Sequence, residues 1–328
     1  MKRNPAIDLF RLLLMMGILV LHLISMEQYW TQMRHVAYLL LPCVDGFVLI
    51  TGYFGLRFSI RKIVMLYLVA FWSLLMVCGL QHFLDGGVCV CEYFRLFKEL
   101  WFLHAYALMM CFTPMVEAVF DSSNNLKAKA ILMPVLFVVF GWGLASQVAG
   151  IHHFVPSMAG LTPKSGFTLL GVYVIGRLYR LHEDRFDALP MYVYVLAFLM
   201  LGCLCTLGMG WLGAYNSPIA VLFALSAFHV VKRWIVLPRF VERMVVWLSP
   251  SVFAIYVLHA NDYSYRIMAH MVEALRSFVP MGMAFALVAI LVFCICLMID
   301  LIRRFLFSFL YGMFESGGNT WAHLRAKT

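Results

Sequence analysis

The sequence predicts an all-α integral membrane protein, a bundle of about ten transmembrane helices with both termini in the cytoplasm. Of its 328 residues, 64% are hydrophobic and only 12% are charged, whereas soluble domains carry roughly a quarter charged residues. Apolar segments of about 20 residues, enough to cross a hydrocarbon core of about 30 Å as a helix, recur along the whole chain. Lys and Arg lie mainly between these segments, and mostly on one side.

The apolar segments follow one another with short connections and leave no second domain. Backbone groups in lipid must be hydrogen-bonded within their own segment, so each segment is predicted to be a helix. Residues 1–305 would form the ten-span membrane domain, and residues 306–328 a short cytoplasmic or interfacial tail. We expect the spans at residues 6–26, 36–56, 63–84, 100–120, 128–148, 166–182, 189–211, 217–232, 245–261 and 281–302.

The distribution of basic residues orients these spans. With ten spans, 19 of the 25 Lys and Arg residues fall on the side of the N-terminus and 6 on the other side. The positive-inside rule then places both termini in the cytoplasm, and the protein is expected in the inner membrane. The stretch "MKRNPAIDLF" also fits the start of a signal peptide, but the apolar run after it has no small-residue cleavage site, so it is interpreted as a retained first span.

Charge and cysteine content narrow the possible partners. The net charge of +9 comes from residues between spans, so membrane lipids are the expected partners and nucleic acid is not. The nine cysteines lie mostly in apolar runs and match neither a zinc site nor a disulfide framework. No metal is expected, and the oligomeric state is not predicted.

The first span carries an arginine and a histidine on one face. Arg11 and His22 are eleven residues apart, so on an α-helix they differ by about 20° in azimuth and about 16 Å along the axis. Met15 and Ile18 complete that face, and Asp8 is placed for an ion pair with Arg11. Ionisable groups at such depth usually face protein or a wet cavity, and often mark a functional path. Taken singly, Arg11 also fits a membrane anchor and His22 an interhelical hydrogen bond.

Six stretches in the same order resemble the membrane-bound acyltransferase-3 family. The first, "IDLFRLLLMMGILVLHL", resembles that family's first helix, in which ten residues separate a basic residue from a histidine. The match covers residues 5 to about 305, with Thr51 where the family has a serine. The other five stretches are "VDGFVLITGYFGLRFSIRK", "ELWFLHAYALMMCFTPM", "VYVIGRLYRL", "YNSPIAVLFALSAFHV" and "SPSVFAIYVLHAN".

This resemblance implies an enzyme that moves an acyl group, usually acetyl, from cytoplasmic acyl-CoA to a hydroxyl of a carbohydrate or glycolipid at the outer face. Acetyl-CoA would be the acyl donor, and His22 a general base or a transient acyl carrier. Arg11 would meet the CoA phosphates at the inner mouth. Asp45 would orient His22 or pair with Arg11, because a buried carboxylate without a partner is costly.

Further residues can be assigned to the two ends of the expected path. Arg57, Arg61 and Lys62 form a cytoplasmic basic cluster that would bind the CoA phosphates, with simple membrane anchoring as the alternative. Arg177, at the inner end of the sixth span, is assigned in the same way.

On the acceptor side, Trp101 and Tyr106 would line the acyl or sugar pocket, although aromatic residues in a span more often only pack. Tyr215 and Asn216 are placed for sugar hydroxyls, and His259 for acceptor binding or proton relay. A competing hypothesis is a transporter or flippase of a lipid-linked sugar or an acyl-carrying metabolite, with Arg11 and His22 as a gating or proton-relay pair. A third, a non-enzymatic membrane sensor, would not need a histidine in register with an arginine. Transporters often contain inverted repeats, and none is visible here.

Overall fold

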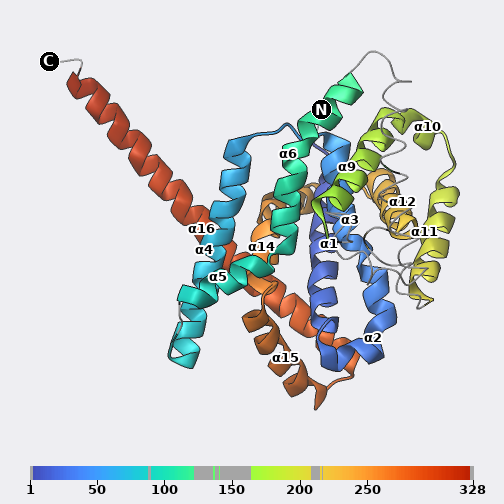
Figure 1. Cartoon of the computed structure of the whole chain (residues 1–328), viewed down its shortest axis with the longest axis horizontal. Helices are drawn as coiled ribbons and strands as arrows, with labels where there is room; N and C mark the ends of the chain where they lie inside the picture. Colours follow the sequence, from blue (N-terminus) through green and yellow to red (C-terminus); the bar gives the residue numbers. More distant parts are fainter. Residues whose placement is uncertain are drawn as a thin grey trace, which may run out of the picture.

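The structure is a computed structural model, and it describes residues 3–87, 90–121, 136, 140, 164–207, 215 and 217–325. The regular elements of the described residues are all helical (Figure 1). In chain order they are α1 (Pro5–Ile24), α2 (Glu27–Leu40), α3 (Pro42–Phe54), α4 (Ile60–Asp85), α5 (Val90–Glu99), α6 (Trp101–Asp121), α9 (Gly166–Leu181), α10 (Glu183–Asp187), α11 (Met191–Thr206), α12 (Pro218–Trp234), α13 (Arg239–Leu248), the 3₁₀ turn η3 (Ser249–Ser251), α14 (Val252–His259), α15 (Asp262–Arg276) and α16 (Met281–Arg325).

Among the described residues, six helical segments are long and apolar enough to cross a membrane. Helices α9, α11 and α12 match three more of the expected spans but have only 16, 16 and 17 residues. The expected span at 128–148 lies outside the described residues except for residues 136 and 140. The chain is therefore a helical membrane protein, and the number ten and the orientation stay predictions. The six segments are Pro5–Ile24, Tyr29–Phe54, Ile60–Asp85, Trp101–Asp121, Arg239–His259 and Met281–Ser308.

Helix α1 lies at the centre of the bundle and contacts α2, α3, α12, α13, α14, α15 and α16. Its start is fixed by Asn4, whose side-chain oxygen accepts a hydrogen bond from the backbone N–H of Ala6 at 3.0 Å, and by Pro5 in the first turn, where a missing N–H costs nothing. The helix ends at Ile24, two residues after His22. His22 thus lies in its last turn, at the far end from Arg11.

The second span is two helices. Prediction placed its start at residue 36, but the apolar segment begins at Tyr29 and breaks between α2 and α3. The break falls at Pro42, which has no backbone N–H to continue the ladder of α2. Two glycines let α3 approach α9 closely: a Cβ on Gly52 would lie 2.2 Å from the carbonyl oxygen of Tyr173, and one on Gly176 would lie 2.5 Å from that of Leu49.

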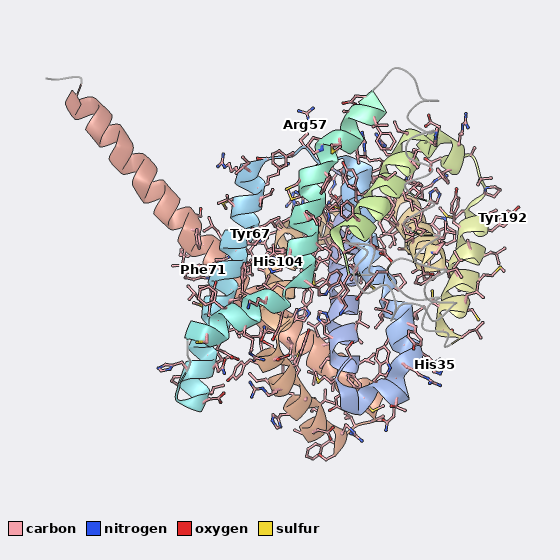
Figure 2. The ribbon with its side chains drawn as sticks, viewed as in Figure 1. His35, Arg57, Tyr67, Phe71, His104 and Tyr192 are labelled. Atoms are coloured by element: carbon pink, nitrogen blue, oxygen red, sulfur yellow. The ribbon has the colours of Figure 1, made fainter. Side chains whose placement is uncertain are left out.

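Helices α4 and α6 lie next to each other and are joined by a tyrosine and a histidine (Figure 2). His104 Nε2–H donates to the carbonyl oxygen of Phe97 at 3.1 Å, so its Nδ1 accepts from the Tyr67 hydroxyl at 3.3 Å. His104 is thereby a structural residue. Between α4 and α6 the sequence predicted a loop, but residues 90–99 form α5, whose ionic partners include Asp262 at the start of α15.

The ninth expected span is broken into α13, η3 and α14 at Pro250. Ser249 and Ser251 lie buried in this 3₁₀ turn, and their hydroxyls accept hydrogen bonds from Arg3 and Arg304. Helix α16 does not end at residue 302 but continues to Arg325 and projects beyond the other helices (Figure 1).

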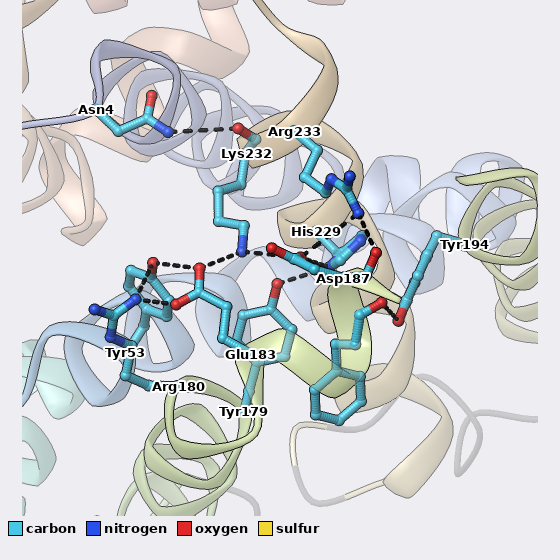
Figure 3. Close-up of polar contacts among 11 residues, drawn as sticks. Asn4, Tyr53, Tyr179, Arg180, Glu183, Asp187, Tyr194, His229, Lys232 and Arg233 are labelled. Carbon is cyan, nitrogen blue, oxygen red and sulfur yellow. Dashed lines mark hydrogen bonds and ion pairs between the residues drawn. The ribbon is translucent and has the colours of Figure 1, made fainter. Parts of the chain in front are cut away.

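A polar network joins helix ends near the start of α1 (Figure 3). Glu183 of α10 accepts hydrogen bonds from Tyr53, from Arg180 and from Lys232, the last at 2.5 Å. Asn4, just before α1, donates to the carbonyl oxygen of Lys232 at 3.4 Å. The network thus holds α3, α9, α10 and α12 in place around the start of α1.

Candidate active site

Arg11 and His22 line the same cavity. This cavity has a volume of about 240 Å³, and we call it the inner cavity. Met15 and Ile18 line it between them, which confirms the predicted shared face of α1. The rest of the wall is mostly aromatic and aliphatic, and comes from α3, α4, α6, α14 and Tyr215, three residues before α12. It consists of Val44, Phe47, Thr51, Leu66, Trp101, Phe102, Tyr106, Tyr215, Val252, Phe253 and Tyr256.

Arg11 is held by a buried carboxylate. Its Nη1 donates to Asp8 Oδ1 at 2.7 Å, which confirms the predicted ion pair. Asp8 is 1% exposed and also accepts from Arg3 Nε at 2.7 Å and from the Ser249 hydroxyl at 2.9 Å. The same hydrogen bond from Arg3 raises the pKa of its guanidinium. The guanidinium has five N–H donors and gives one of them to Asp8, so Arg11 keeps donors for a ligand, and its side chain is 30% exposed.

His22 is paired with a second histidine. Its Nδ1 lies 3.0 Å from Nε2 of His259, at the end of α14. The other ring nitrogen of His259, Nδ1, lies 2.6 Å from the carbonyl oxygen of Ile255. His259 is fully buried and lines a separate, mostly apolar cavity of about 300 Å³ between α4, α14, α15 and α16. Within the described residues, the histidine pair therefore stands between two cavities.

A larger cavity of about 590 Å³ adjoins the inner cavity and is lined by Arg61, Lys62 and Arg303. We call it the basic cavity. Leu66, Tyr106 and Phe253 line both cavities, so these three side chains form the boundary between them. Arg303 is held in place because its Nε donates to Asp300 Oδ1 at 2.7 Å.

Three predicted residues lie elsewhere. Arg57 lines neither cavity. Arg177 is engaged away from both, with its Nη2 donating to Glu117 Oε2 at 2.8 Å. Asp45 is fully buried, and neither carboxylate oxygen has a hydrogen-bond partner among the residues the structure describes. The expected pairing of Asp45 with His22 or Arg11 is wrong, because Asp8 and His259 take those places.

On the predicted acceptor side, Trp101, Tyr106 and Tyr215 all line the inner cavity. The rings of Trp101 and Tyr215 lie 5.4 Å apart, and the Tyr106 hydroxyl lies 3.3 Å from that of Thr51. Asn216 lies outside the described residues. Tertiary packing thus brings residues 11, 22, 101, 106 and 215 to one cavity, although they come from three separate stretches of sequence.

Sequence reasoning missed two residues that line these cavities and one that lies beside the Trp101 ring of the inner cavity. Tyr256 lines the inner cavity, and its spacing of three residues from His259 on one helix was the available signal. Arg303 lines the basic cavity, and sequence reasoning counted it only among the basic residues on the side of the N-terminus. Lys164 has its Nζ 5.8 Å from the centre of the Trp101 ring, and it is one of the few basic residues on the side expected to face outward.

The family model described as an acyltransferase domain, acyltransferase-3, matches residues 4–301 of this chain. The matched range includes His259 and every residue that lines the inner or the basic cavity except Arg303. Arg303 lies two residues beyond it. No curated protein and no solved structure matches the chain.

Proposed function

The chain belongs to the acyltransferase-3 family, and from that premise we propose that this membrane acyltransferase transfers an acetyl group from cytoplasmic acetyl-CoA to a hydroxyl of a carbohydrate or glycolipid at the outer face. The observation that carries the proposal is the arrangement of the two cavities. The basic cavity offers cations near the N-terminus, and the inner cavity, which begins where the basic one ends, holds Arg11 and His22.

The donor fits the basic cavity. CoA carries phosphates at one end and its thioester at the end of a long, thin arm, so cations are needed only at the entrance. Arg61, Lys62 and Arg303 supply them, and Arg11 offers a further guanidinium at the start of the inner cavity. The arm would pass between Leu66, Tyr106 and Phe253 and bring the thioester toward His22.

The acceptor would approach from the other end of the inner cavity. Trp101 and Tyr215 form an aromatic wall there, and flat aromatic faces suit the apolar faces of sugar rings. His22 takes the proton from the acceptor hydroxyl as that oxygen attacks the thioester carbonyl carbon. The carbon–sulfur bond then breaks, and the CoA thiolate leaves and receives the proton from the His22 imidazolium. This direct route needs no covalent intermediate, although an acyl-histidine would use the same geometry.

The test uses inside-out membrane vesicles, labelled acetyl-CoA and the variant His22→Ala. We expect the unmodified protein to release free CoA thiol and to place ester-linked label in the glycan fraction. Because general base catalysis contributes about 10²- to 10⁴-fold, His22→Ala should lower both readouts by at least about 100-fold.

The matched control is His270→Ala, because His270 is exposed on α15 and lines neither cavity. This variant should keep full transfer. Transfer that survives His22→Ala, at normal levels of folded protein in the membrane, would contradict the enzymatic proposal and favour a transporter.

A further inference from the structure

His22, His259 and the carbonyl oxygen of Ile255 are joined by two successive hydrogen bonds. The carbonyl oxygen determines which atom donates in each of them. The carbonyl oxygen of Ile255 can only accept a hydrogen bond. It lies 2.6 Å from Nδ1 of His259, so this nitrogen carries a proton and donates it. In a neutral imidazole only one ring nitrogen is protonated, and Nε2 of His259 is therefore an acceptor.

Because Nε2 of His259 is a hydrogen-bond acceptor, it determines which ring nitrogen of His22 carries the proton. Nδ1 of His22 lies 3.0 Å from Nε2 of His259, and one of the two must be the donor. Because His259 Nε2 accepts, His22 Nδ1 carries the proton, and His22 Nε2 is left with its lone pair. Among the described residues, Nε2 of His22 has no hydrogen-bond partner in the protein, and His22 lines the inner cavity.

The second histidine is held more rigidly than the first. His259 is 0% exposed and is the last residue of α14. The turn that follows is fixed by Asn261, whose amide donates to the carbonyl oxygens of Val257 at 3.3 Å and Leu258 at 3.1 Å. The same side chain caps α15 by accepting from the backbone N–H of Ser264. With both ring nitrogens engaged, His259 has none left for an acceptor molecule.

We infer that His259 is a positioning residue: it holds His22 in the tautomer whose Nε2 is the base facing the inner cavity. This inference rests on the proposed function and deepens it. When His22 takes the acceptor's proton on Nε2, its Nδ1–H continues to donate to His259, so the imidazolium keeps its hydrogen bond. The proton then leaves from Nε2 to the CoA thiolate, and His259 itself changes no bond.

The experiment compares two substitutions of similar size, His259→Gln and His259→Met. The amide oxygen of Gln can accept the hydrogen bond from His22 Nδ1, and the Met side chain offers only a weak acceptor. Removing the partner that orients a metal-bound histidine typically costs about 10- to 100-fold in affinity or activity, and we expect a loss of the same size for His22. We expect His259→Met to lower kcat in that range without changing KM for acetyl-CoA, and His259→Gln to restore most of the loss.

A spectroscopic readout separates positioning from simple packing. In protein labelled with ¹⁵N-histidine and held in nanodiscs, the chemical shifts of His22 should show a protonated Nδ1 and an unprotonated Nε2. His259→Met should shift this balance, and His259→Gln should keep it. His22→Ala identifies the His22 signals and gives the activity floor.

The outcomes are distinguishable. Equal kcat in the Gln and Met variants, or a proton on Nε2 of His22 in the unmodified protein, would overturn the inference while His22→Ala still abolished transfer. A rise in KM for the acceptor alone would also overturn it and assign His259 to acceptor binding. Transfer that persists in His22→Ala would refute the proposed function itself.

Discussion

The substitution Gly52→Ala tests whether the close approach of α3 and α9 stabilises the fold and the candidate site. Replacing Gly52 with Ala puts a methyl group 2.2 Å from the carbonyl oxygen of Tyr173 and 3.1 Å from Cα of Gly176. Both neighbours are backbone atoms of α9, so no side chain can move aside. Ordinary contact begins near 3.4 Å, and the two helices must therefore separate by about 1 Å, because close-packed interiors have no space to absorb the overlap.

The cost of that separation lies at the upper end of the range for overpacking, about 3 kcal/mol. Ala also gains about 1 kcal/mol over Gly in helix propensity, and this gain can be measured separately with Gly79→Ala. Gly79 lies in α4 and is exposed, with nothing within 4 Å of its added Cβ. The difference in unfolding free energy between the two variants therefore isolates the clash.

The assay is thermal unfolding in detergent, followed with a dye that reacts with thiols as the buried Cys78, Cys205 and Cys296 become accessible. Gly52→Ala should unfold several degrees below the unmodified protein, and Gly79→Ala at or slightly above it. Activity should fall as well, because Thr51 of the same helix lines the inner cavity and a misplacement of about 1 Å can cost about 100-fold. If Gly52→Ala is as stable as Gly79→Ala, the close approach of α3 and α9 is refuted.

Two further predictions concern the two ends of the bundle. Replacing both Arg61 and Lys62 with Gln removes two cations from the basic cavity. Because a hydrogen bond to a charged group contributes about 1.5–3 kcal/mol, KM for acetyl-CoA should rise about 10- to 100-fold and depend less on salt. The control Arg239→Gln changes an exposed residue outside both cavities and should leave KM unchanged, whereas an equal rise in KM would mean that only general surface attraction was lost. At the other end, Tyr29 donates to Glu273 at 2.7 Å, and this hydrogen bond, followed by those from Arg276, lowers the pKa of Glu273 below its ordinary value of 4.5. A carboxyl whose pKa is lowered on folding stabilises the protein above its unfolded-state pKa, and this stabilisation is lost as the pH falls through its folded-state pKa. Unfolding temperatures measured from pH 6 to pH 3 should therefore fall less steeply for Glu273→Gln than for the unmodified protein. Identical curves for the two proteins would contradict the lowered pKa of Glu273.

The sequence alone determined the membrane setting and one face of the site. Apolar length and the scarcity of charge are local properties, so most helices could be predicted to within a few residues. Helical periodicity within α1 is equally local, and it placed Arg11, Met15, Ile18 and His22 on one face before any packing was known. The Asp8–Arg11 pair follows from the same periodicity.

Tertiary structure decided which partners those side chains take. Asp45 looked like a possible partner of His22, but His259, 237 residues further along the chain, takes that place. Nothing in a one-dimensional pattern specifies which face of α14 packs on α1, because that depends on side-chain fit over several helices at once.

The same limit explains the basic residues. Arg57, Arg61 and Arg303 all look like anchors at span ends, and only the packing of α4 against α6, α14 and α16 puts two of them into a cavity and leaves the third outside it. Helical periodicity determines on which face of a helix a residue lies, whereas the packing of the helices determines which residues or cavities that face contacts.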